Sequence, residues 1–144
     1  MLKGIPAILS PEILKALCEM GHGEKLIIAD GNFPAHSVCP NSIIIRADGH
    51  GTAEMLDAVL KVVPLDAYTD APVTLMEVLP GDTCPTPTIW GTYREVLQNN
   101  DPEHCGIKQV QRYDFYDLAK DAYVVICTGE TAIYANILLQ KGIV

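Results

Sequence analysis

The chain has 144 residues, of which 49% are hydrophobic and only 19% are charged, so it can bury one sizeable core as a single domain over residues 1–144. Ten Lys and Arg residues against eighteen Asp and Glu residues leave a net charge of −8, which argues against nucleic acid and anionic membrane surfaces as partners. The small charged fraction also favours an oligomer, in which subunits hide part of one another's surface.

The N-terminal residues and the cysteines indicate the cellular compartment of the protein. No apolar run near the start is long enough for a signal peptide, and none elsewhere approaches the length of a membrane span, so we expect a cytoplasmic protein. Five cysteines with no C-x-x-C pair predict reduced thiols with a structural role instead of a redox or zinc site.

The first half of the chain is predicted to form two helices and two short buried strands. Ser10-Pro11-Glu12 supplies an N-cap, a first-turn proline and an acidic residue, which together indicate a helix start. Apolar residues then recur at helical spacing until two glycines, and again from Thr52 until Pro64. In chain order we expect a helix at 11–20, a strand at 26–29, an irregular stretch at 34–40, a strand at 43–46 and a helix at 52–63.

The second half continues the alternation of apolar strands with helices. We expect strands at 73–78, 107–113, 123–127 and 136–140, helices at 88–98 and 114–122, and a proline-containing loop at 82–87. Apolar strands that alternate with helices are typical of a sheet covered on both faces. The sequence therefore predicts an α/β fold, a three-layer α/β/α domain with a mixed or largely parallel sheet.

Polar residues at the strand ends are the candidates for function, because ligands bind beyond the strand ends of such sheets. His22 lies between two glycines at a helix end and suits general acid–base chemistry, although a histidine that complements the helix dipole is the simpler explanation of this position. Asp30 follows a buried strand and either presents its carboxylate to a ligand or closes an Asx-turn.

Two further pairs carry groups that suit sugar hydroxyls. Arg112 and Tyr116 lie four residues apart and share a face if their helix begins early, which would place a guanidinium beside a phenol. Tyr134 and Asn136 precede the last strand and offer a phenol and an amide, although an ordinary turn explains them equally well. We find neither a phosphate or dinucleotide loop nor metal-ligand spacing in the sequence, so no cofactor and no metal are expected.

Four separated blocks of the sequence carry a family likeness: Met20–Gly23, Ile28–Ser37, Arg46–Gly49 and Thr128–Gly142. In order and spacing they resemble the RbsD/FucU sugar-mutarotase family, and the likeness spans nearly the whole chain. The Asn32–Ser37 stretch and the Phe115-Tyr116 pair are similar to the L-fucose branch of that family more than to its ribose branch.

The resemblance implies an α/β/α subunit that assembles into a ring-shaped homodecamer, with a sugar pocket at the boundary between neighbouring subunits. It also implies that His22 is the proton donor, and that Asp66 and Tyr116 hold positions that are catalytic in some relatives. The positions implied to bind the monosaccharide are Asp30, Met76, Arg112, Tyr134 and Asn136.

The activity implied for this branch is an isomerase reaction that interconverts the α and β anomers of L-fucopyranose. The anomeric hydroxyl must lose a proton while the ring oxygen gains one, and the opened chain then closes as the other anomer. Either Asp66 or Tyr116 would handle the proton of the anomeric hydroxyl. The alternatives are pyranose–furanose interconversion of D-ribose or a related aldose, a non-catalytic sugar-binding module, and a purely structural ring protein.

Overall fold

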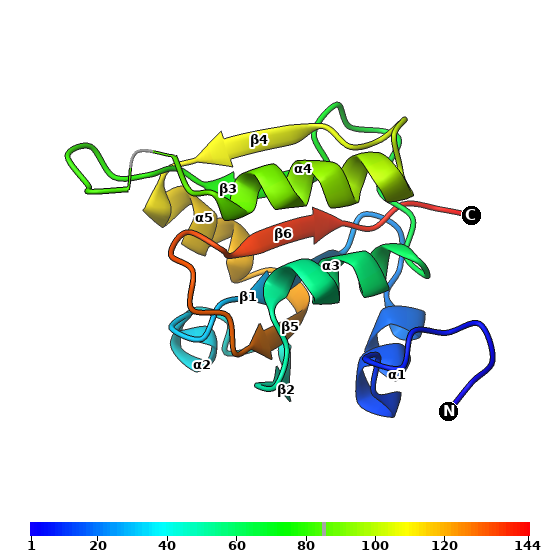
Figure 1. Cartoon of the computed structure of the whole chain (residues 1–144). Helices are drawn as coiled ribbons and strands as arrows, with labels where there is room; N and C mark the ends of the chain where they lie inside the picture. Colours follow the sequence, from blue (N-terminus) through cyan, green and yellow to red (C-terminus); the bar gives the residue numbers. More distant parts are fainter. Residues whose placement is uncertain (85) are drawn as a thin grey trace.

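The computed structural model describes residues 1–84 and 86–144, and within them six strands form one sheet in the order β2-β5-β1-β6-β3-β4 (Figure 1). The strands are β1 (Lys25–Ala29), β2 (Ile43–Ala47), β3 (Val73–Met76), β4 (Ile107–Val110), β5 (Ala122–Thr128) and β6 (Ile137–Gln140). The helices are α1 (Pro11–Glu19), α2 (Ala35–Val38), α3 (Thr52–Leu60), α4 (Ile89–Asn100) and α5 (Arg112–Ala119).

The direction of β6 makes the sheet mixed. β5 pairs parallel with β1 and with β2, and β3 pairs parallel with β4, whereas β6 pairs antiparallel with both β1 and β3. Residues that follow β1 and β3 therefore meet residues that precede β6 at one end of the sheet. Residues that follow β6 meet those that precede β1 at the opposite end.

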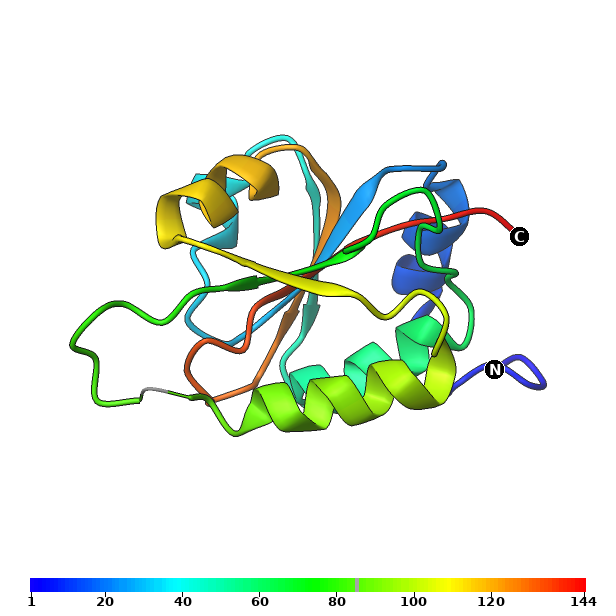
Figure 2. The ribbon, with the colours of Figure 1, turned by 90° about the horizontal axis from the view of Figure 1, so that it is seen from above.

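Helices cover both faces of this sheet (Figure 2). α1, α3 and α4 pack over one face, where Leu17, Leu56 and Tyr93 join a single buried cluster. α2 and α5 pack over the other face, where Ala35 and Phe115 belong to a second cluster. The inner strands β1, β5 and β6 are buried on both sides, which is why they are continuous apolar runs and do not alternate with polar residues. The predicted three-layer α/β/α fold is confirmed.

The order of the predicted elements is confirmed, but the expected irregular stretch at 34–40 is wrong in one respect. It contains the short helix α2, which forms because the amides of Ser37 and Val38 both bond to the carbonyl of Pro34, at 3.1 and 3.0 Å. The loop expected at 82–87 includes Pro85, which lies outside the described residues. No helix within the described parts of the chain is long and apolar enough to cross a membrane.

The expected boundary between strand and helix near residue 113 is also wrong. β4 ends at Val110, and α5 begins at Arg112 because the amide of Phe115 bonds to the carbonyl of Gln111 at 2.9 Å. The third strand likewise ends at Met76, two residues earlier than expected. The earlier start of α5 matters for function, because it places Arg112 in the first helical turn.

Truncation of the fully buried Ile28 in the central strand β1 is expected to destabilise the fold in proportion to the atoms removed. Ile28→Val should lower the free energy of unfolding by about 0.5–1.5 kcal/mol and Ile28→Ala by about 2–5 kcal/mol, since the second change leaves the larger cavity. Equilibrium unfolding in urea measures both. If Ile28→Ala lowered the free energy of unfolding by less than the range given for Ile28→Val, this result would contradict the packing described for β1.

Candidate functional site

The expected site residues divide between the two ends of the sheet. Six of the eight lie where β1 and β3 end and β6 begins: Asp30, Met76, Arg112, Tyr116, Tyr134 and Asn136. His22 and Asp66 lie at the opposite end, where β1 begins and β6 ends. The five residues of β1 span roughly 17 Å, so the imidazole of one chain does not reach the cavity of the same chain.

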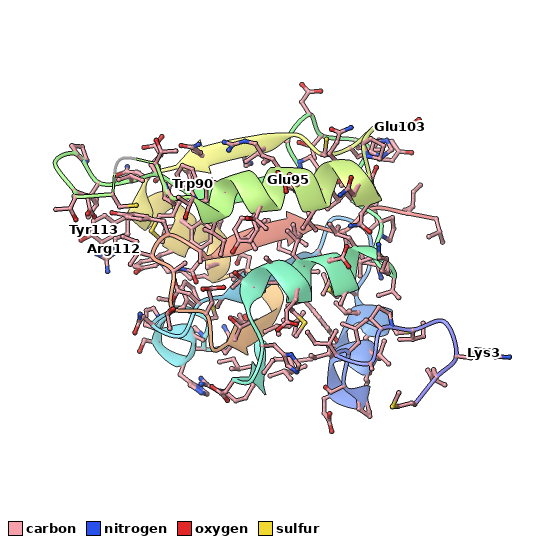
Figure 3. All side chains as sticks on the ribbon, in the orientation of Figure 1. Lys3, Trp90, Glu95, Glu103, Arg112 and Tyr113 are labelled. Atoms are coloured by element: carbon pink, nitrogen blue, oxygen red, sulfur yellow. The ribbon has the colours of Figure 1, made fainter. Side chains whose placement is uncertain are left out.

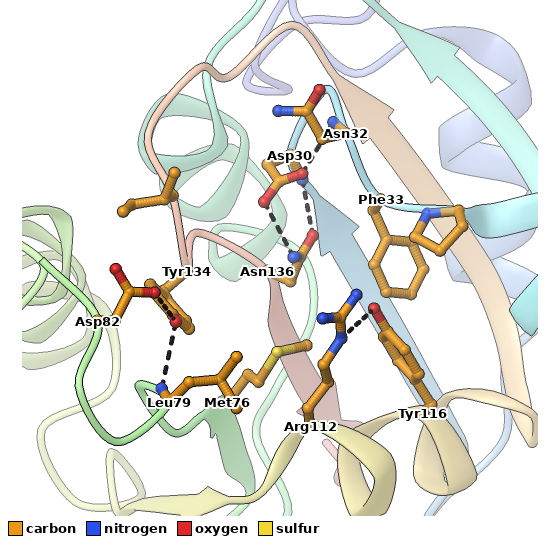
Figure 4. A pocket seen from close by; sticks show the side chains of 12 residues that line it. Asp30, Asn32, Phe33, Met76, Leu79, Asp82, Arg112, Tyr116, Tyr134 and Asn136 are labelled. Atoms are coloured by element: carbon orange, nitrogen blue, oxygen red, sulfur yellow. Dashed lines mark hydrogen bonds between the residues drawn. The ribbon is translucent and has the colours of Figure 1, made fainter. Parts of the chain in front are cut away.

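The six grouped residues line one cavity of about 300 Å³ (Figure 4). Its size lies at the small end of the range for ligand pockets, which suits a small polar molecule. The described residues that complete its wall are Asn32, Phe33, Pro34, Leu79, Asp82 and Ile133. The wall therefore combines two carboxylates, a guanidinium, two phenols and amides with a few apolar side chains.

A reciprocal hydrogen-bonded pair joins the end of β1 to the start of β6. The amide N–H of Asp30 donates to Asn136 Oδ1, and Asn136 Nδ2 donates back to Asp30 Oδ2, both at 2.9 Å. Asp30 Oδ1 also accepts the amide N–H of Asn32 at 2.9 Å, so the Asx-turn expected as one alternative is present, and the same residue lines the cavity. Burial raises the pKa of Asp30, while the hydrogen bonds from Asn32 and Asn136 oppose that rise.

Helix α5 delivers a guanidinium and a phenol to the same wall. Arg112 Nε donates to the hydroxyl of Tyr116 at 3.0 Å, and the guanidinium carbon lies 5.4 Å from the centre of that ring. Phe33 supports the Tyr116 ring edge-on, with the ring centres 6.1 Å apart. The Nε atom is bound in this contact. The two terminal nitrogens of Arg112 point into the cavity (Figure 4).

Tyr134 is held in an unusual backbone conformation. Within the described residues it is the only non-glycine residue with a positive φ, 57°, a left-handed conformation that costs about 1–2 kcal/mol. Its hydroxyl donates to a carboxylate oxygen of Asp82 and accepts the amide N–H of Leu79 at 3.2 Å. The hydrogen bond to the Asp82 carboxylate raises the pKa of Tyr134. These contacts direct the phenol along the cavity wall.

The cavity residues outside the eight expected site positions differ in the sequence signal that points to them. Asn32, Phe33 and Pro34 directly follow the strand β1, and the rule that ligands bind beyond strand ends points to them. Asp82 and Ile133 come from loops with no local signal. Only their contacts with the rest of the fold bring them to the cavity.

At the opposite end of the sheet, His22 and Asp66 form a histidine–carboxylate pair. His22 Nε2 lies 3.1 Å from Asp66 Oδ1. The His22 side chain is 44% exposed, whereas that of Asp66 is only 4% exposed, so the carboxylate is internal and the imidazole reaches the surface. The ionised carboxylate can only accept, so His22 Nε2 is the donor in this contact, and Nδ1 is the ring nitrogen left for another partner.

The Asp66 carboxylate accepts three hydrogen bonds. Besides His22, its carboxylate accepts the amide N–H of Tyr68 at 3.0 Å and the side-chain Nε2 of Gln140 at 2.8 Å. The Tyr68 amide, with the His22 and Gln140 side chains, lowers the pKa of Asp66 despite its burial. The group is therefore ionised at neutral pH.

The chain that leaves β6 holds this pair in place. The amide of Asp66 bonds to the carbonyl of Gln140 at 3.1 Å, and the amide of Gly142 bonds to the carbonyl of Pro64 at 2.8 Å. A Cβ at Gly142 would come within 2.3 Å of the carbonyl oxygen of Leu65, so the close approach of these two segments requires glycine. An apolar groove, lined in part by Leu14, Leu17 and the C-terminal residues, opens beside His22.

Comparison with known proteins identifies the family. The family model of the "RbsD / FucU transport protein family" matches residues 3–144. The chain belongs to this family. It is 45% identical to the human protein "Fucose mutarotase" over 146 residues, which cover 99% of this chain and 94% of that protein.

Two solved members of the RbsD/FucU family share the fold in detail. The crystal structure of FucU from Bifidobacterium longum is 55% identical, with a TM-score of 0.94 and coverage of 99% of both chains. The crystal structure of the fucose mutarotase from Streptococcus pneumoniae, in complex with L-fucose, is 45% identical, with a TM-score of 0.90 and coverage of 99% of both chains.

Asp66→Asn is expected to destabilise this RbsD/FucU protein in a pH-dependent way. Near pH 7 it should lower the free energy of unfolding by about 1–3 kcal/mol, because it removes a hydrogen-bonded charge. The folded-state pKa of Asp66 lies below its ordinary value of 3.8, so its stabilisation is present above that value and is lost as the pH falls through the folded pKa.

The difference between the urea midpoints of wild type and Asp66→Asn should therefore shrink as the pH falls from neutral toward about 3. Asp121→Asn, at an exposed acid, is the matched control and should show little difference at either pH. A difference for Asp66→Asn that stays constant across this range would contradict a native-state carboxylate with a lowered pKa.

Proposed function

We propose that this protein is an L-fucose mutarotase, an isomerase that interconverts the α and β anomers of L-fucopyranose by acid–base ring opening and reclosure. The observation that carries the proposal is the full-length likeness to the Streptococcus pneumoniae fucose mutarotase, whose structure holds L-fucose. A cavity of monosaccharide scale, rich in hydroxyl-binding groups, supports it. A cytoplasmic location is part of the proposal.

The cavity offers complementary partners for an uncharged sugar. Asp30 supplies a carboxylate that accepts hydrogen bonds, Arg112 supplies donors, and Asn136 supplies both. Met76 and Ile133 provide apolar surface for the C6 methyl group that distinguishes fucose from sugars with a hydroxymethyl group there. An uncharged substrate also needs no electrostatic steering, which agrees with the net charge of −8.

The reaction requires one group to protonate the ring oxygen and another to take the proton of the anomeric hydroxyl. We assign the first role to His22, which presents an exposed imidazole whose orientation Asp66 controls. The burial of Asp66 and its three donors argue that it acts through His22 and does not touch the sugar. Tyr116 is then the group that handles the anomeric hydroxyl: its phenolic oxygen, on the cavity wall, takes that proton while the phenol passes its own proton on to water.

This assignment needs a second copy of the chain. Because His22 and the cavity of its own chain lie at opposite ends of β1, the sugar would meet the cavity of one subunit and the His22 of its neighbour. The apolar groove beside His22 supports a subunit contact at that position. A ring-shaped homodecamer with its pockets at the subunit boundaries satisfies this geometry.

His22→Ala is expected to slow anomer exchange of L-fucose by about 10²-fold or more, since it removes the proposed proton donor. Magnetisation-transfer NMR measures the exchange. The matched control is His104→Ala, which breaks another histidine–aspartate pair, between His104 Nδ1 and Asp101 at 2.9 Å, and should leave the rate unchanged. Wild-type exchange in His22→Ala would refute the assignment.

The same assay tests the competing functions. Faster pyranose–furanose exchange of D-ribose than anomer exchange of L-fucose would favour the ribose reaction. Saturable binding of L-fucose with no acceleration of exchange would favour a sugar-binding module, which the family description as transport proteins allows. Failure to bind any aldose at millimolar concentration would leave only a structural role.

A shared site predicts complementation between two inactive variants. His22→Ala and Arg112→Gln chains, each impaired alone, should regain activity when co-expressed, because one chain supplies an intact His22 and the other an intact cavity. Random mixing of equal amounts should restore about a quarter of the sites if each is built from two chains. No recovery in mixed oligomers verified by mass spectrometry would contradict a site shared between subunits.

A further inference from the structure

Two aromatic side chains of α4, Trp90 (labelled in Figure 3) and Tyr93, hold the backbone between the cavity residues Tyr134 and Asn136. Trp90 Nε1 donates to the carbonyl oxygen of Tyr134 at 2.9 Å, and the hydroxyl of Tyr93 donates to the carbonyl oxygen of Ala135 at 2.5 Å. Two successive carbonyls of residues 134–136, which we call the sugar-facing segment, are thus bound to one helix.

The sugar-facing segment needs such support. It lies before β6 begins at Ile137, so strand pairing does not fix it. Tyr134 has φ 57°, a conformation that a residue with a Cβ adopts only when its surroundings impose it. Because the side chains of Tyr134 and Asn136 line the cavity, a small rotation of this backbone would move both of them.

The supporting residues are internal. Trp90 is 4% exposed and Tyr93 is fully buried, and neither is among the described residues that line the cavity. They can therefore affect a sugar in the cavity only through the segment whose carbonyls they bind. α4 itself is anchored against α3, with Tyr93 and Leu97 in the cluster that covers this face of the sheet.

The hydroxyl of Tyr93 has two close partners, the carbonyl oxygen of Ala135 and the hydroxyl of Thr52, each at 2.5 Å. The carbonyl of Ala135 can only accept, so the Tyr93 hydroxyl is the donor in that contact. The amide of Thr52 in turn donates to the Glu130 carboxylate at 3.3 Å. Loss of the phenolic hydroxyl would leave buried polar groups unpaired next to the segment.

We infer that Trp90 and Tyr93 are positioning residues for sugar recognition: through the carbonyls of residues 134 and 135 they set the placement of Tyr134 and Asn136 in the cavity. The identity of the sugar rests on the proposed function. The reacting groups assigned above lie on other elements, so these two side chains control affinity for the sugar and leave the proton transfers unaffected.

Trp90→Phe and Tyr93→Phe test this inference, since each removes a donor while it keeps an aromatic ring. Each should raise the Kd of L-fucose, measured by calorimetry, and the KM for anomer exchange by about three- to tenfold, the equivalent of one hydrogen bond, with kcat changed by less than about twofold. An unchanged Kd in both variants would overturn the inference, as would a loss confined to kcat.

Leu97→Val is the matched control for general destabilisation, because Leu97 lies on the same helix, is 1% exposed and belongs to the same cluster. It should lower the Tm and leave the Kd unchanged, and a Kd raised as much as in the two variants would overturn the inference. If Tyr93→Phe does not fold, Trp90→Phe carries the test alone. Wild-type protein that binds L-fucose without accelerating exchange would refute the proposed function, while the Kd values would still decide the positioning role.

Discussion

The antiparallel strand β6 is the element on which the rest of the structure depends. It lies between β1 and β3 and runs opposite to both, so its start reaches the carboxyl ends of its neighbours and its end reaches their amino ends. At the start, Asn136 exchanges two hydrogen bonds with Asp30. At the end, Gln140 bonds to Asp66 through both its side chain and its backbone. A strand of four residues thereby organises both the cavity wall and the His22–Asp66 pair.

The cavity wall and the His22–Asp66 pair differ in which polar atoms they leave available. The cavity wall leaves donors and acceptors of Asp30, Arg112 and Asn136 available to a ligand, and loops and a helix start deliver them. The carboxylate of Asp66 faces inward and accepts hydrogen bonds from His22, Tyr68 and Gln140. Such a buried, saturated carboxylate suits the orientation of an imidazole better than direct proton transfer with a sugar.

Much of the fold was predictable because its signals are local. The cap of α1, the apolar runs of the inner strands and the proline after α3 each act within a few residues, so the order of elements followed from the sequence. The start of α5 was misplaced because Arg112 carries no strong capping signal before it. The contact between Arg112 and Tyr116, predicted only for an early helix start, follows from the corrected boundary.

By itself the sequence determined the α/β class, the residue types at the strand ends and, through its likeness to a family, the expected catalytic and sugar-binding positions. The tertiary structure alone decided that six of those positions form one cavity and that His22 and Asp66 lie at the far end of the sheet. The physical reason is distance along the chain. Asp30 and Asn136 are 106 residues apart, and their contact depends on which strands pair and in which direction, which no local periodicity encodes.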